Sequence, residues 1–508
     1  MGTLSISNSF LHTSDLKSFL DAPGKVRLSP ESRKRISKSH QHLKALLAGG
    51  HKIYGVNTGF GKLSNVSIPE DDQKTLQLNL VRSHSAGVGK PFDHGITRLT
   101  MILKLMTLAK GYSGVRIEVA NQLVDFINHD ILPIVPRQGS VGASGDLAPL
   151  SHIALGLIGE GNVHFQDRIL PAIVAIKEAG LIPLVLGAKE GLSLINGTQV
   201  SSSLGIKALV NAEIILKTAD IVGAMSVEGS LASRNVFARK LHQLKHHKGQ
   251  QQSAKNVWNF LKNSAIIDSH EDCDKIQDPY SLRCIPHVHG SSRELFLTAK
   301  QMVENEANSV SDNPLIFSDK DIRSGGHFHA EAVAQAMDSL SIAMSEMGAI
   351  SERRIHYFMK GIENKVPMFV AHDPGLESGF MMAQVTAASL VSENKTLAHP
   401  ASVDSISTSA GQEDFVSMAP WAGRKCLRIM NNVSQILAIE LYVAATVITE
   451  FHGNLKPADC SKKVINVLRR HVNLSKGDHP LYEDMAVVNE LIRSGKILNS
   501  VSKLMKLE

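Results

Sequence analysis

The segment Gly139–His152 concentrates small and polar residues around the tripeptide Ala143-Ser144-Gly145. It reads GSVGASGDLAPLSH, and its three glycines allow the backbone to fold tightly and to approach itself closely. A phosphate-binding loop would need a Lys after its last glycine, and a hydrolase nucleophile elbow would need Gly where this chain has Asp146. Both sites are excluded by inspection, and a plain flexible loop does not explain the order Ala-Ser-Gly-Asp.

This segment resembles the signature of the histidine and aromatic amino acid ammonia-lyases, and the resemblance extends over nearly the whole chain. In that family the amide nitrogen matching Gly145 attacks the carbonyl carbon matching Ala143, and the serine is dehydrated. The resemblance therefore implies a 4-methylidene-imidazole-5-one formed by the chain itself, with no external cofactor. Gly offers an unhindered nitrogen, Ser144 offers a hydroxyl that leaves, Ala keeps the ring uncrowded, and Asp146 is suited to assist the proton movements.

Removing ammonia from an amino acid requires such a group because the β-proton is barely acidic and the amine is a poor leaving group. No natural side chain is a strong electrophile, so the difficult step is given to a cofactor. The protein must then hold the substrate carboxylate, the substrate ring and a base in register.

Other loops supply residues that match the family's active site. Tyr54 begins YGVNTGFG and resembles a family tyrosine that acts as base or proton shuttle. Asn196, in EGLSLINGTQ, matches an asparagine that contacts the electrophile and the substrate. Either residue taken alone would be interpreted as packing or capping.

The stretch KIQDPYSLRC adds Gln277, Tyr280 and Arg283. The guanidinium of Arg283 suits the substrate carboxylate because its planar donors bind carboxylates in a bidentate manner. Tyr280 resembles the second family tyrosine, which lies on a mobile loop that closes the site.

The remaining matches concern the choice of substrate. Phe328, in SGGHFHAE, matches an aromatic residue that lines the pocket, and Gln412 and Glu413 lie in SAGQEDFVSMAP. A carboxylate at 413 accepts a hydrogen bond from an imidazole N–H, which phenylalanine lacks. His84, in LVRSHSAGVG, also fits a polar ring. We therefore expect L-histidine as substrate, with trans-urocanate and ammonia as products.

Several positions differ from typical histidine ammonia-lyases and leave the substrate open. They are Gly411 for Asn, Phe415 for His, His327 for Asn, and the histidines at 287 and 289. Tyrosine remains an alternative substrate, and so does a trimethylated betaine of thiol-substituted histidine.

Two His-x-His pairs, His287/His289 and His327/His329, raise a second class, a metal-dependent enzyme with nitrogen ligands. The pairs are about forty residues apart in loops that the family resemblance already explains, so we expect no metal. A third class is a catalytically silent oligomeric protein that keeps the fold.

The elements that must position these loops are mainly helical. Apolar residues spaced three and four apart predict helices at Ile96–Leu108, 199–231, 294–310, 330–350, 379–397, 427–451 and, as one or two shorter helices, 482–507. Strands are few and short. The fold class is therefore mainly α, and the resemblance implies an ammonia-lyase-like fold with a long central helical bundle. We expect an N-terminal domain over residues 1–200 that carries the electrophile and a bundle domain over 201–508 with substrate-binding loops.

Composition limits the other possibilities. The chain has 508 residues, 43% of them hydrophobic and 20% charged, and a net charge of +6, which is ordinary for a globular protein. The densest basic stretch, Arg239 to Lys248, has no interleaved aromatic residues, so we expect no nucleic-acid partner. The apolar run 436–448 is interrupted by Glu440 and is too short to span a bilayer. The four cysteines, including Cys273, form no CxxC pair, and the N-terminus lacks a signal pattern, so we expect a cytoplasmic protein. The resemblance implies a homotetramer with sites shared between subunits.

Overall fold

The computed structural model describes residues 2–271, 275–475 and 477–508, so Cys273 lies outside the described residues. The chain is 58% helix and 7% strand, which confirms the mainly α fold class. Contacts divide it into two compact units. The first comprises 1–207, 300–338 and 400–424, and the second comprises 208–299, 339–399 and 425–508. The predicted domain boundary at residue 200 stays a prediction.

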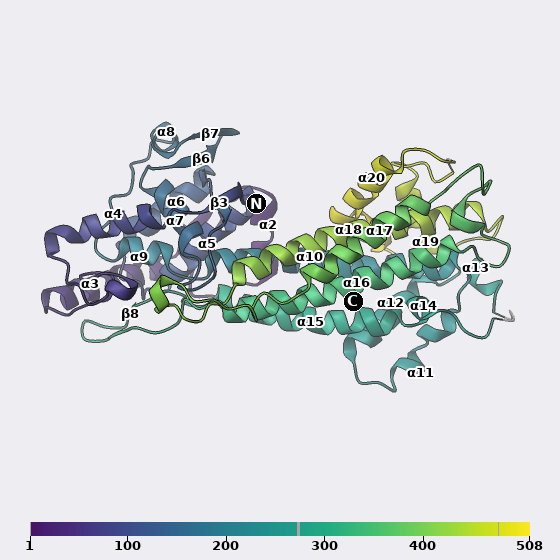
Figure 1. Cartoon of the computed structure of the whole chain (residues 1–508), viewed down its shortest axis with the longest axis horizontal. Coiled ribbons are helices and arrows are strands. Elements are labelled where there is room, and N and C mark those ends of the chain that lie inside the picture. Colours follow the sequence, from purple (N-terminus) through teal and green to yellow (C-terminus); the bar gives the residue numbers. More distant parts are fainter. Residues whose placement is uncertain (1, 272–274, 476) are drawn as a thin grey trace. The chain divides into compact units, whose positions relative to one another are not determined.

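The first unit contains short helices and small sheets joined by long loops (Figure 1). Its helices are α1 Thr13–Leu16, α2 Ser18–Asp21, α3 Pro30–Ala48, α4 Gln73–His84, α5 His94–Ala109, α6 Ile117–His129, α7 Leu147–Leu157, α8 Ala172–Glu178 and α9 Glu190–Ile195, with 3-10 turns at Gly61–Leu63, Glu70–Asp72 and Ser409–Gly411. Its strands are β1 Leu4–Ile6, β2 Val26–Leu28, β3 Val88–Pro91, β4 Leu132–Pro133, β5 Pro136–Gln138, β6 Asn162–Phe165, β7 Arg168–Pro171, β8 Leu315–Ile316 and β9 Ile322–Arg323. The strands pair as β1-β2, which is parallel, and as β3-β5, β4-β6-β7 and β8-β9, which are antiparallel.

Helices α4, α7 and α9 pack against one another and surround the loops that carry the signature residues. Helix α5 is buried along almost its whole length, because residues 95–109 are all buried. It is capped at its N-terminus by Asp93, whose carboxylate accepts a hydrogen bond from the amide of Ile96 at 3.0 Å. The predicted helix Ile96–Leu108 is therefore confirmed, and it is a core element rather than a surface helix.

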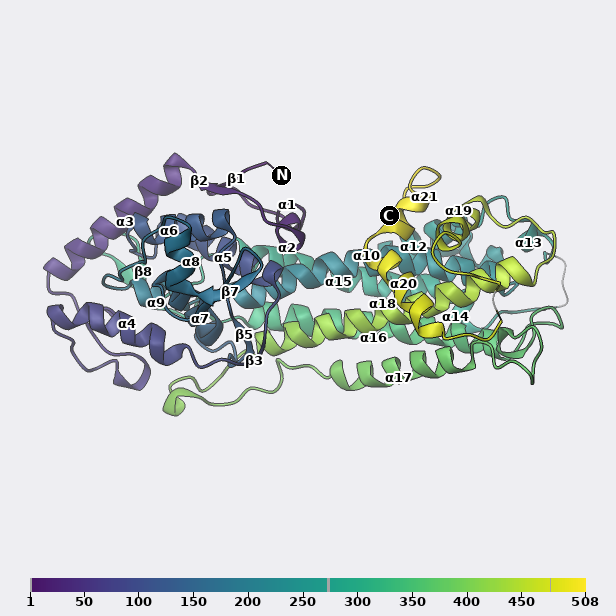
Figure 2. The same cartoon turned by 90° about the horizontal axis from the view of Figure 1, so that it is seen from above.

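Four long helices have most of their residues in the second unit and run side by side in both views (Figures 1 and 2). They are α10 Gln199–Gly229, α15 Ile285–Ala307, α16 Glu331–Met359 and α18 Ala419–Glu450. The shorter helices are α11 Arg239–His242, α12 Lys248–Phe260, α13 Ala265–Asp268, α14 Tyr280–Arg283, α17 Met381–Leu397, α19 Asp459–Leu468, α20 Leu481–Arg493 and α21 Lys496–Val501, with 3-10 turns at Arg234–Phe237 and Met368–Val370.

A buried ion pair holds three of these helices together. Glu440 and Arg354 are both fully buried, and their side chains meet at 2.5 Å and 2.9 Å. Ser226 and Ser351 donate hydrogen bonds to the same carboxylate. Glu440, the residue that interrupts the apolar run, is therefore paired and fully hydrogen-bonded, which is the condition for burying a charge.

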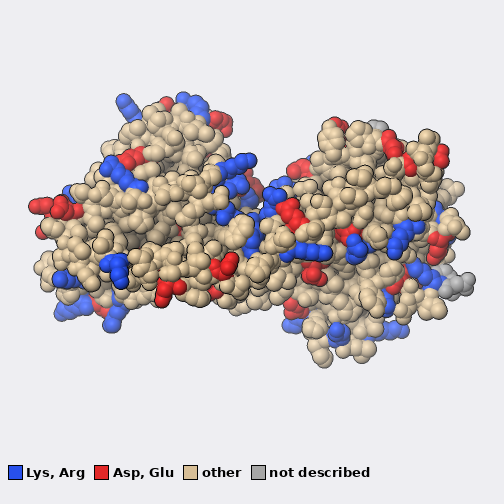
Figure 3. Space-filling model, in the orientation of Figure 1, with Lys and Arg blue, Asp and Glu red and all other residues tan. Residues whose placement is uncertain are grey.

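Helix α18 is long and apolar enough to cross a membrane by length and composition, and 89% of its most apolar window is buried within the structure. Such burial is also typical of a core helix. On the face drawn in Figure 3, basic and acidic side chains are interspersed over the surface.

Three predicted helix bounds were wrong by eight residues or more. Helix α15 begins at Ile285 rather than at 294, α16 ends at Met359 rather than at 350, and α18 begins at Ala419 rather than at 427. The two histidines at 287 and 289 therefore lie on a helix, where residues two apart point in different directions.

Candidate active site

The Ala143-Ser144-Gly145 loop lies in the first unit between β5 and α7. Gly142 and Gly145 have φ values of +68° and +74°, in the left-handed region that glycine tolerates. A side chain at either position would also collide. A Cβ on Gly142 would lie 2.2 Å from Ser417 Oγ, and one on Gly145 would lie 2.1 Å from the carbonyl oxygen of Gly197. The glycines are therefore required by close packing as well as by backbone conformation.

The loop is fixed on both sides by backbone hydrogen bonds. The amide of Asp146 donates to the carbonyl of Gly197 at 2.7 Å, and Met418 donates to Val141 at 2.8 Å. Ser417 Oγ donates to the carbonyl of Gly142 at 3.0 Å. Two segments that are distant in sequence, at Gly197 and at residues 417–418, therefore hold the tripeptide in one compact bend.

Asp146 is fully buried and accepts hydrogen bonds from the amide and the hydroxyl of Ser201, both at 2.8 Å. These donors lie in the first turn of α10, where a carboxylate is favourable. Burial raises the pKa of the Asp146 carboxyl to about 6, although the Ser201 bonds oppose this shift. A carboxyl group with a pKa near neutrality suits proton transfer.

The Ser144 hydroxyl donates to Glu413 Oε1 at 2.9 Å. The other carboxylate oxygen of Glu413 accepts from Thr408 Oγ1 at 2.7 Å and from Ser409 Oγ at 2.8 Å. Sequence reasoning placed Glu413 in the pocket but missed these two hydroxyls, which orient it. Two hydroxyl residues four and five positions before the glutamate were the only available signal.

His84 is the last residue of α4 and is electrostatically coupled to Glu413. Its Nδ1 lies 2.9 Å from the carbonyl of Leu80. Because a carbonyl only accepts, we assign the ring proton to Nδ1, which leaves Nε2 as an acceptor. Burial lowers the pKa of His84, against the opposing effects of Leu80 and Glu413, so the neutral form is favoured at neutral pH.

Tyr54 lies half-buried in the loop before the 3-10 turn Gly61–Leu63, and its hydroxyl accepts a hydrogen bond from the amide of Gly61 at 3.0 Å. Gln77, fully buried on α4, links this loop to α9. It donates to the carbonyl of Gly55 at 2.9 Å and accepts from the amide of Leu192 at 3.0 Å. Sequence reasoning missed Gln77, because a glutamine within a helix carries no signal of its partners.

Asn196 ends α9 and is 2% exposed. Its side-chain amide donates to the carbonyl of Asn313 at 3.0 Å. Its Oδ1 is buried and has no hydrogen-bond partner within the described chain. A buried acceptor without a donor costs about 1–3 kcal/mol, so Asn196 Oδ1 is a candidate acceptor for a donor from a ligand.

Three of the departures from the family pattern, Gly411, Phe415 and His327, lie in the first unit. Gly411 has a φ of +81°, a region that Gly and Asn share, so this replacement of Asn preserves the backbone. Phe415 stacks on His329 at 6.1 Å between ring centroids, and its carbonyl lies 3.2 Å from His329 Nε2. Phe328 is half-buried on the same turn, whereas Gln412 and His327 are exposed.

The three residues of the KIQDPYSLRC stretch belong to the second unit. Tyr280 is 71% exposed, and the guanidinium of Arg283 lies over its ring at 4.7 Å. The Nε of Arg283 is buried without a hydrogen-bond partner among the described residues, and Gln277 is exposed. Arg283 therefore has a donor available for a ligand.

The two His-x-His pairs also fall in different units. His289 is fully buried and bonds Asp220 at 2.8 Å, while the ring of His287 faces His242 at 5.8 Å. Among the described residues no group of three or more His, Cys, Asp or Glu side chains is arranged to hold a metal ion.

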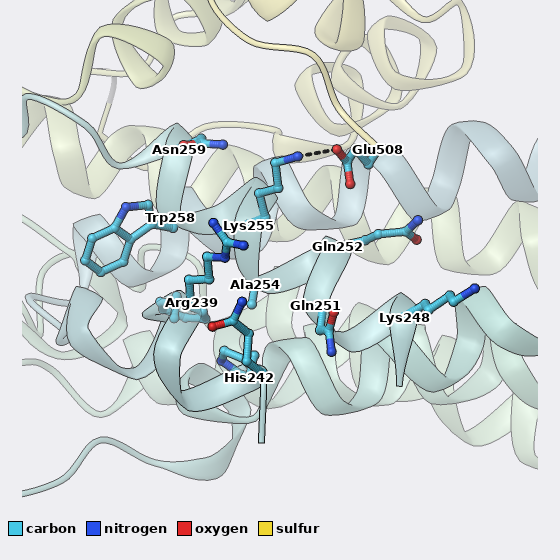
Figure 4. A pocket seen from close by; sticks show the side chains of 12 residues that line it. Arg239, His242, Lys248, Gln251, Gln252, Ala254, Lys255, Trp258, Asn259 and Glu508 are labelled. Atoms are coloured by element: carbon cyan, nitrogen blue, oxygen red, sulfur yellow. Dashed lines mark hydrogen bonds and ion pairs between the residues drawn. The ribbon is translucent and has the colours of Figure 1, made fainter. Parts of the chain in front are cut away.

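A cavity of about 620 Å³ lies elsewhere, in the second unit, and is lined in part by the basic stretch (Figure 4). Arg239, Lys248 and Lys255 contribute cations, and Lys255 pairs with Glu508. None of the residues predicted for the active site lines this cavity within the described chain.

Comparison with known proteins places this site in a family. The family described as aromatic amino acid lyase matches residues 11–470. The chain is 47% identical to a histidine ammonia-lyase from Gloeobacter violaceus over 94% of this chain and 93% of that protein. Its structure is similar to that of histidine ammonia-lyase from Trypanosoma cruzi, with a TM-score of 0.91, 37% identity and coverage of 99% and 96%. It is also similar to a tyrosine aminomutase from Streptomyces globisporus, with a TM-score of 0.94, 32% identity and full coverage of both chains. The Ala-Ser-Gly loop, its bracing segments and these similarities together lead to one conclusion: the chain belongs to the aromatic amino acid lyase family and is a carbon–nitrogen lyase.

Proposed function

We propose that the chain catalyses the non-oxidative deamination of L-histidine to trans-urocanate and ammonia. The observation that carries this proposal is the 2.9 Å hydrogen bond between Ser144 and Glu413, because it puts an acceptor for an imidazole N–H beside the reactive tripeptide. The histidine ammonia-lyases among the relatives support the same substrate.

We also propose that Ala143-Ser144-Gly145 cyclises with loss of two water molecules to the methylidene-imidazolone. The tight bend, the unhindered glycine nitrogen and the buried Asp146 fit that closure. The unpartnered Asn196 Oδ1 fits the finished site, which must bind an amine. The group supplies an electrophilic carbon that activates the substrate for loss of its amine.

The side chains of the chain then hold the substrate. His84 Nε2 and Glu413 accept hydrogen bonds from the substrate ring, and Asn196 Oδ1 accepts from its amine. Arg283 binds the carboxylate in a bidentate manner. Tyr54 and Tyr280 supply the phenols for removal and delivery of protons. Gln277, Phe328 and Gln412 complete the pocket walls.

We propose that a homotetramer brings together site residues that belong to different units of each chain. In this proposal each site combines loops from three subunits, so that Gln277, Tyr280 and Arg283 of one subunit join the Ala-Ser-Gly loop of another. The enzyme acts in the cytoplasm, on a free amino acid.

One experiment tests the substrate. The purified protein is incubated with histidine, tyrosine, phenylalanine and the trimethylated thiol-histidine betaine in parallel, and ultraviolet absorbance follows each conjugated product. We expect a signal with histidine. A signal confined to tyrosine or the betaine would overturn the choice of histidine but keep the reaction class.

Intact mass tests the electrophile independently of any substrate. The protein should weigh two water molecules less than its sequence. An unshifted mass would contradict the proposed group and favour a silent relative. Activity that is lost to chelators together with bound metal would favour the metal-dependent alternative.

A further inference from the structure

Lys104 lies in the middle of α5 with its side chain only 1% exposed. Its Nζ donates to the backbone carbonyl of Asn196 at 2.6 Å and to that of Ser193 at 3.1 Å. The structure records no ion pair for it among the described residues. Burial lowers the pKa of Lys104 to about 7, although Asp312 and Asp146 raise it in part. Burying an ammonium group costs several kcal/mol, so a lysine here is unfavourable for stability alone.

The contacts of Lys104 complete the fixation of Asn196. The backbone amide of Asn196 donates to Leu192 at 2.9 Å, its carbonyl accepts from Lys104, and its side-chain Nδ2 donates to Asn313. Three of the four polar groups of this residue are therefore held by the protein. The fourth, Oδ1, is the buried acceptor that lacks a partner in the described chain.

A second buried lysine contacts the same segment, at the end of α9. Lys189 and Asp312 are fully buried and pair at 3.1 Å, and Lys189 also donates to Ser193 Oγ at 2.9 Å. Asp312 accepts a hydrogen bond from the amide of Asn313 at 2.7 Å, and the carbonyl of Asn313 accepts one from the side chain of Asn196. Both buried lysines thus bond Ser193, and Lys104 also bonds Asn196; both lie outside the family motifs quoted above.

The Asn196–Gly197 turn also packs against the Ala143-Ser144-Gly145 loop. Gly197 follows Asn196 directly, forms a β-bridge with Gly145 and accepts from the amide of Asp146 at 2.7 Å. A shift of Asn196 therefore moves the backbone against which the tripeptide is packed.

We propose that Lys104 is a positioning residue that fixes the Asn196–Gly197 turn, so that Asn196 Oδ1 is aimed at the substrate amine and Gly197 supports the tripeptide. This proposal rests on the proposed function. A purely structural role, in which Lys104 only satisfies the last carbonyls of α9, predicts a different result on substitution.

The experiment compares Lys104→Met, which removes the donor at similar length, with Lys104→Gln, which keeps a donor one atom shorter. Lys110→Met is the matched control, because Lys110 ends the same helix and its charge faces Arg35. For each protein we would measure kcat and KM with histidine, the thermal midpoint, and the fraction of chains that lack two waters.

We expect Lys104→Met to lower kcat per electrophile-bearing chain, or the fraction of such chains, about 100-fold, because misplacement by about 1 Å has effects of that size. KM should change less than kcat. The thermal midpoint should change little, because the removal of a buried charge and the loss of a donor to two buried carbonyls oppose one another. The quantity that falls in Lys104→Met should be at least about tenfold higher in Lys104→Gln, and Lys110→Met should match the wild type.

The proposal is overturned if Lys104→Met keeps both wild-type kcat and wild-type electrophile content, whether or not its thermal midpoint falls. It is also overturned if Lys104→Gln is as impaired as Lys104→Met, since a hydrogen-bond donor would then not be the relevant property. Failure of the proposed function is seen separately, in a wild-type protein that lacks the mass deficit or does not turn over histidine.

Discussion

Ser144, Glu413 and His84 form the chemical centre of the proposed site at the scale of single residues. Glu413 is oriented by two hydroxyls and accepts a hydrogen bond from Ser144, while the neutral tautomer of His84 presents Nε2 as an acceptor. In the proposed site these two acceptors suit a ring that carries polar hydrogens. The motif matches located these residues in the sequence, but only the structure shows which oxygen of Glu413 is used for orientation.

Glu413→Gln tests the carboxylate at nearly constant size. We expect kcat/KM for histidine to fall by about 10²-fold or more, because an amide is a weaker acceptor and does not stabilise a developing positive charge on the ring. The measurement is urocanate formation by absorbance. Ser409→Ala serves as a control that removes only one orienting bond and should cost about tenfold or less. Equal activity of Glu413→Gln and the wild type would show that the charge has no role.

Asp146→Asn tests the buried carboxyl through the pH dependence of stability. The folded-state pKa of about 6 lies above the unfolded value of 3.8. The stabilising contribution is therefore complete below pH 3.8 and is lost as pH rises through about 6. The loss amounts to about 3 kcal/mol for a shift of this size. Relative to the wild type, the Asn variant should gain stability in denaturant unfolding as the pH rises from about 4 to about 6, and the difference should be constant above pH 7. A difference that does not change with pH would contradict this assignment.

At the scale of elements, the reactive loop is defined by contacts between segments that are far apart in sequence. The 139–146 loop packs on the 196–198 turn and on 417–418. Helix α4 contributes Gln77, which bonds Gly55, and His84, which interacts electrostatically with Glu413. Periodicity predicted the helices well because amphipathic spacing is a local property. It placed the start of α15 too late because the segment before it has no clear apolar stripe.

Gly145→Ala tests the close approach of the loop to the turn. The added methyl would lie 2.1 Å from the Gly197 carbonyl at a φ of +74°, so the bend cannot form without a backbone shift. We expect an inactive protein with unshifted intact mass and a helical circular dichroism spectrum close to that of the wild type.

Gly180→Ala is the matched control for that variant. Gly180 has a φ of +70° with open space around its Cβ position, so it shares the backbone strain without the collision. It should lose about 1 kcal/mol of stability and keep its mass deficit and activity. Equal loss of the electrophile in both variants would mean that strain, rather than contact with Gly197, is responsible.

At the scale of the whole molecule, the residues of the proposed site are divided between two units of the chain. The electrophile loop, Tyr54, His84, Asn196 and Glu413 belong to one unit, whereas Gln277, Tyr280 and Arg283 belong to the other. In the proposed homotetramer, a site shared between subunits would join these groups through symmetry, as is common in closed oligomers.

Subunit mixing tests this arrangement. Ser144→Ala and Tyr280→Phe should each be nearly inactive alone. Co-expressed in equal amounts, they should recover about one quarter of wild-type activity, because each of two independent contributions is intact in half of the subunits. Light scattering should show a tetramer in every sample. Absence of recovery in verified mixed tetramers would mean that each site takes both residues from one chain.

The sequence by itself determined the reaction class, because the Ala-Ser-Gly-Asp signature and its companion motifs are tied to one chemistry. It also determined most of the helices, because helical periodicity is a local property of the sequence. The sequence also placed Gly411 where the backbone has a positive φ, and Glu413 where a hydroxyl side chain donates a hydrogen bond to it. Only the tertiary structure revealed the buried polar residues that hold the segments around the tripeptide in place. Lys104, Gln77 and the Lys189–Asp312 pair act through partners that lie tens of residues away along the chain. A buried lysine or glutamine in a helix has the same local sequence whether its partner is water or a carbonyl. Long-range packing alone therefore decided which polar groups surround the electrophile.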